Sequence, residues 1–202
     1  MRSVIPAIDV SHLPTVTFGH RNATWWGTIG FMLIEGTTLA LVAASYLYVR
    51  KNYFAWPPER TPFPDLGIPT LQLGVMLVSL IPAYLAKQSA LKLDRGATAL
   101  WLWVSSALGL AILTLRWFEL GALNTRWDTH AYGSVAWAVL GFHGSLLVLD
   151  LFDTVGLAYL MSSGRASAKH FPATTDNTDY WMFIMLAWVP LYVLVFLSPR
   201  WI

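Results

Sequence analysis

Long apolar stretches separated by short polar connections dominate the pattern of the chain. Five stretches stand out, at residues 25–48, 69–85, 97–115, 131–161 and 180–197. A helix that crosses a bilayer needs about 20 mostly apolar residues, whereas a membrane β-strand shows only a short alternation of apolar and polar positions. The unbroken runs therefore predict an all-α membrane protein, a bundle of five transmembrane helices.

The segments outside these runs predict no second folded domain. Residues 1–24 contain prolines and an aspartate and no apolar core, so we expect a surface arm rather than a signal peptide, followed by a five-helix transmembrane domain at 25–202. The longest connection, 49–68, carries Trp56 followed by two prolines, which favours extended chain at the membrane surface.

Composition and charge point to the same class of protein. Hydrophobic residues make up 56% of the chain and charged residues 12%, about half the charged fraction of a soluble domain. The net charge is +2 and the basic residues are scattered, so we expect no nucleic-acid partner. The chain has no cysteine, which excludes disulfides, thiolate metal sites and iron–sulfur clusters.

The distribution of basic residues predicts an orientation. Seven of the 13 Lys and Arg residues fall on the amino-terminal side of the predicted spans and six on the opposite side. The densest short basic connection, with Lys87, Lys92 and Arg95, lies on the amino-terminal side, and short connections count most in the positive-inside rule. We therefore expect a cytoplasmic amino terminus.

Glu35 lies ten residues into the first apolar run, where a carboxylate costs about 2.5 to 3.5 kcal/mol on insertion scales. It shares a narrow helical sector with Thr28, Val42 and Tyr46, so we expect it to face protein rather than lipid. Two interpretations remain open. Glu35 is either a proton-exchanging or modulatory carboxyl, or a protonated structural glutamic acid hydrogen-bonded to a neighbouring helix.

A polar seam follows one line of the fourth run, formed by Tyr132, His143, Asp150 and Thr154, with Asp153 to one side. A relay or ligand set is one interpretation. However, His143 and Asp150 are seven residues apart, about 10 Å along a helix, which is too far to share one metal. Hydrogen bonds between helices are therefore the favoured interpretation.

The third run ends near Arg116 and Glu119, which are three residues apart on one helix face and predict an ion pair at the membrane interface. Its connection to the fourth run is short, so the two helices should be antiparallel neighbours. We therefore expect His143 to bond a carboxyl, with Glu119 preferred over Asp150.

Redox and hydrolytic motifs are missing from the sequence. A membrane haem normally needs axial histidines and a di-iron bundle needs Glu-x-x-His pairs, yet only His143 of the five histidines lies deep in a span. We expect no catalytic, cofactor-binding or metal-binding residue in this chain.

The chain has eleven tryptophans, which suggest a belt of aromatic side chains at the membrane surfaces. Aromatic side chains expected at a lipid or subunit interface are Trp25, Trp26, Trp56, Tyr132 and Trp181.

Several of these segments resemble, in order and spacing, subunit III of the haem–copper cytochrome c oxidases. Residues 25–35, Trp-Trp-Gly-Thr-Ile-Gly-Phe-Met-Leu-Ile-Glu, are similar to the glutamate-bearing third helix of that family. The Trp-Pro-Pro segment at 56–58, Tyr-Gly-Ser at 132–134, Gly-Phe-His-Gly at 141–144 and Tyr-Trp-x-Phe at 180–183 match later family segments. Glu119 falls where the family keeps a glutamate.

The resemblance implies a divergent five-helix form that begins where the third helix of the seven-helix form begins. Family positions for histidine, histidine and aspartate hold Leu146, Met182 and Met185, respectively, and Arg116 stands where a glutamine is usual. Two aspartates in the fourth run, Asp150 and Asp153, are additional to the family pattern.

The resemblance further implies a function: a non-catalytic, cofactor-free accessory subunit of a proton-pumping oxidase in a bacterial inner membrane. Haem and copper would belong to partner subunits, including the catalytic subunit I, and phospholipid would bind along the bundle. Glu35 would be the family's carbodiimide-reactive carboxyl, supporting proton uptake. A subunit of a quinol oxidase or nitric oxide reductase is an alternative. A small proton or cation channel or carrier is another, although the chain shows no internal repeat.

Overall fold

The computed structural model describes residues 16–201, and the rest of the predicted arm lies outside them. Within this range the chain is helical, without strands, and the predicted fold class is confirmed. Five helices are long and apolar enough to cross a membrane. They are α1 (Ala23–Arg50), α2 (Gly67–Leu91), α3 (Arg95–Gly121), α4 (Ala131–Ser162) and α5 (His170–Tyr192), and α5 continues through a π-helical turn at Val193–Leu197 and a 3-10 turn at Ser198–Arg200.

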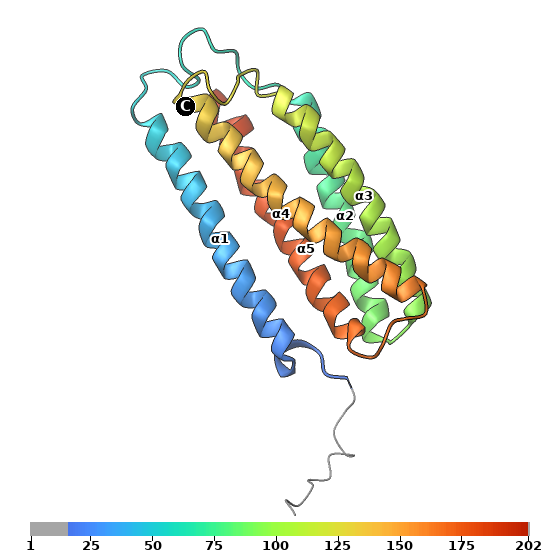
Figure 1. Cartoon of the computed structure of the whole chain (residues 1–202). Helices are drawn as coiled ribbons and strands as arrows, with labels where there is room; N and C mark the ends of the chain where they lie inside the picture. The colour runs from blue at the N-terminus through green and yellow to red at the C-terminus, as the bar shows by residue number, and fades with distance from the viewer. Residues whose placement is uncertain (1–15, 202) are drawn as a thin grey trace, which may run out of the picture.

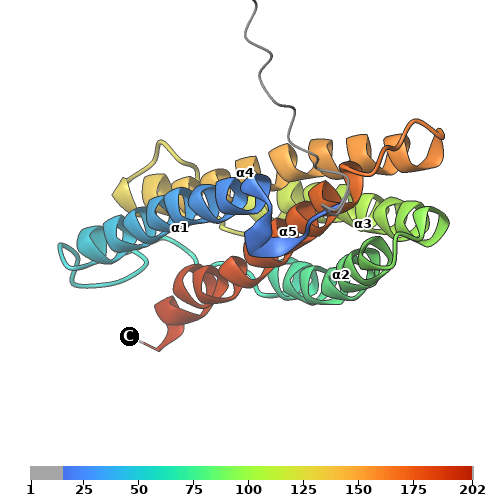
Figure 2. The same ribbon diagram turned by 90° about the horizontal axis from the view of Figure 1, so that it is seen from below.

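The helices form an elongated bundle in which successive helices run in opposite directions (Figure 1). Seen from the end, α5 lies between α1 on one side and α2 and α3 on the other (Figure 2). Helix α5 packs against α1, α2 and α4, while α1 packs on α4 and α5. In an 18-residue apolar stretch of α1 only 11% of the residues are buried, against 50% in such a stretch of His170–Arg200, which is α5 with its two terminal turns. Helix α1 is therefore the outer helix and α5 the central one.

Three helices begin at residues whose side chains can accept a hydrogen bond. Asn22, Asp94 and His130 precede α1, α3 and α4 and accept backbone N–H groups of the first turn at 3.2, 3.0 and 3.0 Å. The caps satisfy N–H groups that the helix itself leaves without partners. The sequence therefore fixes these starts locally, and the predicted start of the fourth span at residue 131 is confirmed.

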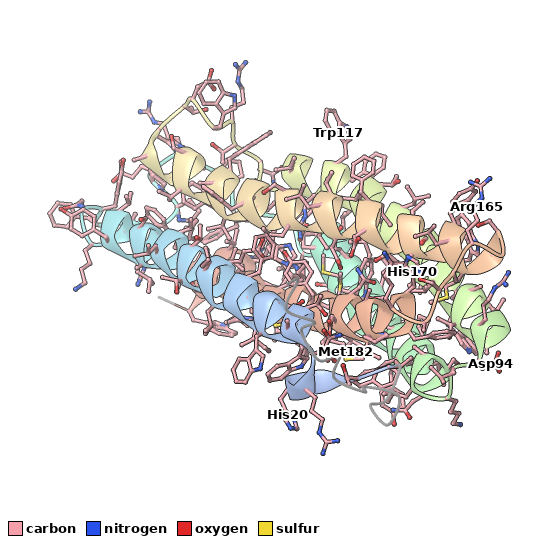
Figure 3. The ribbon with its side chains drawn as sticks, turned by 60° about the horizontal axis from the view of Figure 1, so that its bottom comes forward. His20, Asp94, Trp117, Arg165, His170 and Met182 are labelled. Atoms are coloured by element: carbon pink, nitrogen blue, oxygen red, sulfur yellow. The ribbon has the colours of Figure 1, made fainter. Side chains whose placement is uncertain are left out.

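The predicted start of the fifth span at residue 180 is wrong by ten residues, because α5 begins at His170. Residues 174–179, Thr-Thr-Asp-Asn-Thr-Asp, are too polar for a lipid-facing helix but lie mostly buried against neighbouring helices. Figure 3 places Asp94, Arg165 and His170 at the end of the bundle where the α2–α3 and α4–α5 connections lie.

The connection between α1 and α2 folds back onto the opposite end of the bundle. The indole N–H of Trp56 donates to the Tyr46 hydroxyl at 2.9 Å, and the backbone N–H of Asp65 donates to the Ala122 carbonyl at 2.7 Å. Trp56 is only 6% exposed, so the connection helps to close the core rather than lying freely on the surface.

Candidate functional site: two buried polar clusters

Glu35 contacts α5 from the outer helix. Its side chain is 7% exposed, and the Tyr180 hydroxyl donates a hydrogen bond to Glu35 Oε2. The expectation that Glu35 faces protein is therefore confirmed. The sequence does not predict Tyr180 as the partner of Glu35, because the Tyr-Trp-x-Phe segment at 180–183 carries no information on which helix faces the tyrosine.

A pocket of about 640 Å³ lies beside this contact, between α1, α4 and α5. Its polar lining comes from the first two turns of α1, the second half of α4 and the first half of α5. We call it the acid pocket, and its polar lining residues are Thr24, Thr28, Asp150, Asp153, Asp176, Asn177 and Tyr180.

Hydrogen bonds between helices organise the acid pocket. The amide nitrogen of Asn177 donates to Asp150 Oδ1 at 2.8 Å and to Asp153 Oδ2 at 3.3 Å, while the Thr154 hydroxyl donates to the Asn177 carbonyl oxygen at 3.2 Å. One α5 amide therefore joins three side chains of α4. The favoured interpretation of the α4 seam, hydrogen bonding between helices, is confirmed at Asp150 and Thr154.

Two carboxylate oxygens of the acid pocket have no hydrogen-bond partner among the described residues. They are Asp150 Oδ2, on a side chain that is 2% exposed, and Asp176 Oδ1, whose other oxygen accepts from the Thr24 hydroxyl at 2.7 Å. Lys87 of α2 lies nearby but pairs with Asp179 at 2.5 Å. The pocket therefore carries more acidic groups than the described cations neutralise.

The second cluster surrounds Arg116, which is buried between α3, α4 and α5. Its Nη1 donates to Glu119 Oε2 at 2.6 Å, and both side chains are nearly inaccessible, at 6% and 0% exposure. Its guanidinium also lies 3.9 Å from the ring centroid of Trp188, a cation–π contact. The predicted ion pair is confirmed, and both side chains are buried against neighbouring helices near the end of α3.

His143 joins this arginine cluster. Its Nδ1 lies 2.9 Å from Arg116 Nη2 and its Nε2 lies 3.0 Å from the Ile184 carbonyl oxygen. Because guanidinium N–H groups only donate and a carbonyl only accepts, Nδ1 accepts and Nε2–H donates. No hydrogen bond or ion pair joins the ring to a carboxylate in residues 16–201, so the predicted contact with Glu119 is wrong: Arg116 lies between them.

Three aromatic residues expected at an interface lie in the core instead. Trp56, Tyr132 and Trp181 are 6%, 0% and 2% exposed, and the Trp181 indole donates to the Ser79 hydroxyl at 3.1 Å. Their predicted contact with lipid is therefore wrong. Trp26, at the start of α1, is 60% exposed and can still serve as an interfacial anchor. Outward-pointing Trp117, 76% exposed, also has such a position (Figure 3).

Neither cluster is arranged as a metal site. Over residues 16–201, no group of three or more His, Asp and Glu side chains could hold a metal ion. The arginine cluster instead neutralises a carboxylate with a cation, and the acid pocket joins carboxylates through an amide and hydroxyls.

Five membrane-crossing helices around buried polar clusters define an all-helical integral membrane protein. Curated proteins named cytochrome c oxidase subunit 3 are homologous to this chain over most of its length, which confirms the resemblance to the subunit III family. The protein from Synechocystis sp. is 26% identical over 187 residues, 89% of this chain and 77% of the relative. The protein from Thermostichus vulcanus is 23% identical over 195 residues, 96% and 94% of the two chains.

A protein of the same name from Allomyces macrogynus is 31% identical over 144 residues, 70% of this chain and 52% of the relative. No family model matches the chain. The similarity thus spans fungal and bacterial proteins and includes one relative that this chain covers almost completely.

Proposed function

We propose that this chain is a non-catalytic, cofactor-free accessory subunit of a proton-pumping haem–copper oxidase. The observation that carries the proposal is the similarity over 96% of the chain to a protein named cytochrome c oxidase subunit 3. The catalytic subunit I and other oxidase subunits would hold the haem and copper. This chain would stabilise the catalytic subunit, with phospholipid bound along the bundle.

The polar groups of the bundle support a part in proton uptake. The acid pocket lies towards the end of the bundle at which α1 begins, the end that also carries Lys87, Lys92 and Arg95, and Glu35 lies near the middle of α1. By the positive-inside rule this end is cytoplasmic. In a bacterial inner membrane the carboxyls would then face the side from which such an oxidase takes up protons.

Affinity purification of the tagged full-length chain from respiring membranes tests the proposal. A haem-containing partner should copurify in fixed ratio and show the optical spectrum of a reduced oxidase on addition of dithionite. An untagged strain taken through the same purification is the control. Recovery of a stable, haem-free protein under mild detergent would overturn the proposal, and proton flux into liposomes from the chain alone would favour a channel or carrier instead.

A further inference from the structure

Helix α4 begins at a histidine, an uncommon residue type at a helix start. His130 lies just before α4, and its Nδ1 accepts the backbone N–H of Gly133 at 3.0 Å. In residues 16–201 the other side-chain caps come from Asn22 and Asp94, residue types that are common at helix starts. An amide or an ionised carboxylate accepts a hydrogen bond throughout the range of about pH 5 to 8, whereas an imidazole changes its charge there. Acid can therefore affect the start of α4 in a way that it cannot affect the other two.

Both ring nitrogens of His130 have partners, and the partners determine which nitrogen carries the proton. A backbone N–H only donates, so Nδ1 is the bare nitrogen and Nε2 carries the hydrogen. Nε2 lies 2.9 Å from the hydroxyl oxygen of Thr61, in the connection between α1 and α2, and donates to it. The neutral ring therefore caps α4 and bonds the α1–α2 connection at the same time.

A second proton on His130 removes the cap. It adds to Nδ1, which then becomes a donor and faces the N–H of Gly133, another donor. The positive ring also lies at the amino end of α4, where the helix dipole disfavours a cation. The Nε2–H that bonds Thr61 is present in both charge states, so acid acts on the first turn of α4 rather than on the α1–α2 connection.

The ring of His130 is accessible to protons from water, because it lies at the end of a span and is only partly buried. With Thr61 it lines a pocket of about 640 Å³ between the α1–α2 and α3–α4 connections. The charged and titratable groups on the elements around the ring are Glu59, Arg60, Arg126, Asp128 and Tyr132. In the described part of the chain no carboxylate forms an ion pair with the ring, and Asp128 pairs with Arg126. No ion pair therefore compensates the protonated ring for the lost cap.

The first two turns of α4 hold the α3–α4 connection, so loss of the cap has an effect beyond the ring itself. The hydroxyl of Ser134 donates to the carbonyl oxygen of Trp127 at 2.7 Å. The indole N–H of Trp137 donates to the carbonyl oxygen of Thr125 at 2.8 Å. Fraying of the first turn of α4 therefore loosens the α3–α4 connection as well.

We propose that His130 is an acid-sensitive latch, which holds the first turn of α4 and the α3–α4 connection when the ring is neutral and releases them when it is protonated. The latch lies at the end of the bundle opposite to the α2–α3 and α4–α5 connections (Figure 1). In the orientation proposed above, that end faces the side that a proton pump acidifies. The latch itself is a property of this chain alone and does not depend on the proposed function.

Hydrogen exchange of the full-length chain in lipid nanodiscs tests the latch. His130→Asn supplies a cap that does not titrate, and His130→Ala supplies none. At about pH 8 the backbone N–H groups of residues 131–137 should exchange in the wild type as slowly as in His130→Asn. At about pH 5.5 the wild type should match His130→Ala and exchange on the order of tenfold faster than His130→Asn, as expected for loss of a helix cap. Comparing variants at the same pH cancels the intrinsic pH dependence of exchange.

His170→Asn is the matched control. The Nδ1 of His170 also accepts a backbone N–H, from Ser167 at 2.8 Å, but at the other end of the bundle. This variant should leave the exchange of residues 131–137 unchanged at both pH values. A ratio of wild-type to His130→Asn exchange that is the same at both pH values would overturn the proposal.

Nitrogen-15 NMR of labelled histidine provides a second measurement, which does not need His130→Ala to fold. The His130 signal, assigned by its loss in His130→Asn, should show a bare Nδ1 at about pH 8 and two protonated nitrogens at about pH 5.5. A proton on Nδ1 at about pH 8 would also overturn the proposal. Because both measurements use this chain alone, their outcome is independent of copurification with a haem-containing partner.

Discussion

The hydroxyl of Tyr180 on α5 donates a hydrogen bond to Glu35 of α1, 145 residues earlier in the chain, and so joins the outer helix to the central one. Helix α1 buries little of its apolar surface, so this contact has a large influence on where α1 sits. Phe31, one turn before Glu35, packs its ring 5.7 Å from the Tyr180 ring and reinforces the contact. The same tyrosine lines the acid pocket.

Tyr180→Phe should loosen α1 without disturbing the rest of the bundle. The ring and its contact with Phe31 remain, but Glu35 loses its hydrogen-bond donor, which costs about 1 to 3 kcal/mol for a buried polar group. Labelling of Glu35 by a hydrophobic carbodiimide should become faster, and thermal unfolding in detergent should begin at a lower temperature. Tyr159→Phe, at a 52% exposed tyrosine, is the control. Equal labelling rates in the two variants would contradict the prediction.

Glu35→Gln should separate a modulatory role of the carboxyl from a structural one. Glutamine keeps the shape of the side chain and can still accept the Tyr180 hydrogen bond, but it cannot exchange a proton. In the purified oxidase complex, we expect initial turnover close to that of the wild type and a shorter functional lifetime during sustained turnover. A lifetime equal to that of wild type would favour the structural interpretation.

The sequence predicts helices well where apolar runs are unbroken and poorly where the protein buries polar groups. The run at 131–161 nearly coincides with α4, because apolar character alone describes a span. The apolar pattern excludes residues 170–179 because Asp176 and Asn177 read as loop residues, whereas Thr24 bonds one oxygen of Asp176 and Asp150 accepts from the Asn177 amide, both from other helices. Such partners lie more than 20 residues away and follow only from the packing.

The arginine cluster shows a second limit of sequence reasoning. The prediction that Glu119 and His143 lie on neighbouring helices is confirmed, since α3 packs on α4. Which atoms meet depends on helix rotation, and the long side chain of Arg116, one turn before Glu119, fills the space between them. A donor with several N–H groups in a rigid fork can bond a carboxylate and an imidazole together.

A double-mutant cycle on Arg116 and Glu119 should reveal strong coupling. Arg116→Gln leaves a buried carboxylate without its cation, and Glu119→Gln leaves a buried cation, so each single change should cost about 3 to 5 kcal/mol. The double variant restores neutrality and should be considerably more stable than the sum of the two losses predicts. Chemical unfolding in mixed micelles measures the free energy of unfolding of the two single variants and the double variant. Additive losses would show that the two side chains are not energetically coupled.

The exposed pair of Arg126 and Asp128 should behave differently from the buried pair. Two hydrogen bonds, at 3.0 and 2.8 Å, join the guanidinium to the carboxylate and lower the pKa of Asp128. A lowered pKa in the folded state adds stability above the unfolded pKa and loses it as pH falls through the folded value. Because both groups are open to solvent, Asp128→Asn should shift the acid-unfolding midpoint only slightly. A large shift would mean that the α3–α4 connection is held by this pair.

Replacing a glycine by alanine should affect the stability of the protein differently at three positions on α3 and α4. A Cβ at Gly133 would lie 2.2 Å from the backbone carbonyl oxygen of Arg126, which cannot move without displacing the α3–α4 connection. A Cβ at Gly109 would meet side-chain atoms of Leu151 and Trp181 at 2.7 and 2.9 Å.

Gly133→Ala should therefore destabilise the protein most, because the clash is with backbone. Gly109→Ala should cost about 1 to 3 kcal/mol, as overpacking of a close helix contact does, since leucine and tryptophan side chains can shift in part. Gly141→Ala is the control, because a Cβ there meets nothing within 4 Å, and removing a helical glycine should stabilise the chain by about 0.5 to 1 kcal/mol. Thermal unfolding of the three variants in one detergent gives their order of stability. A Gly109→Ala protein as stable as the Gly141→Ala protein would contradict the close approach of α3 to α4 and α5.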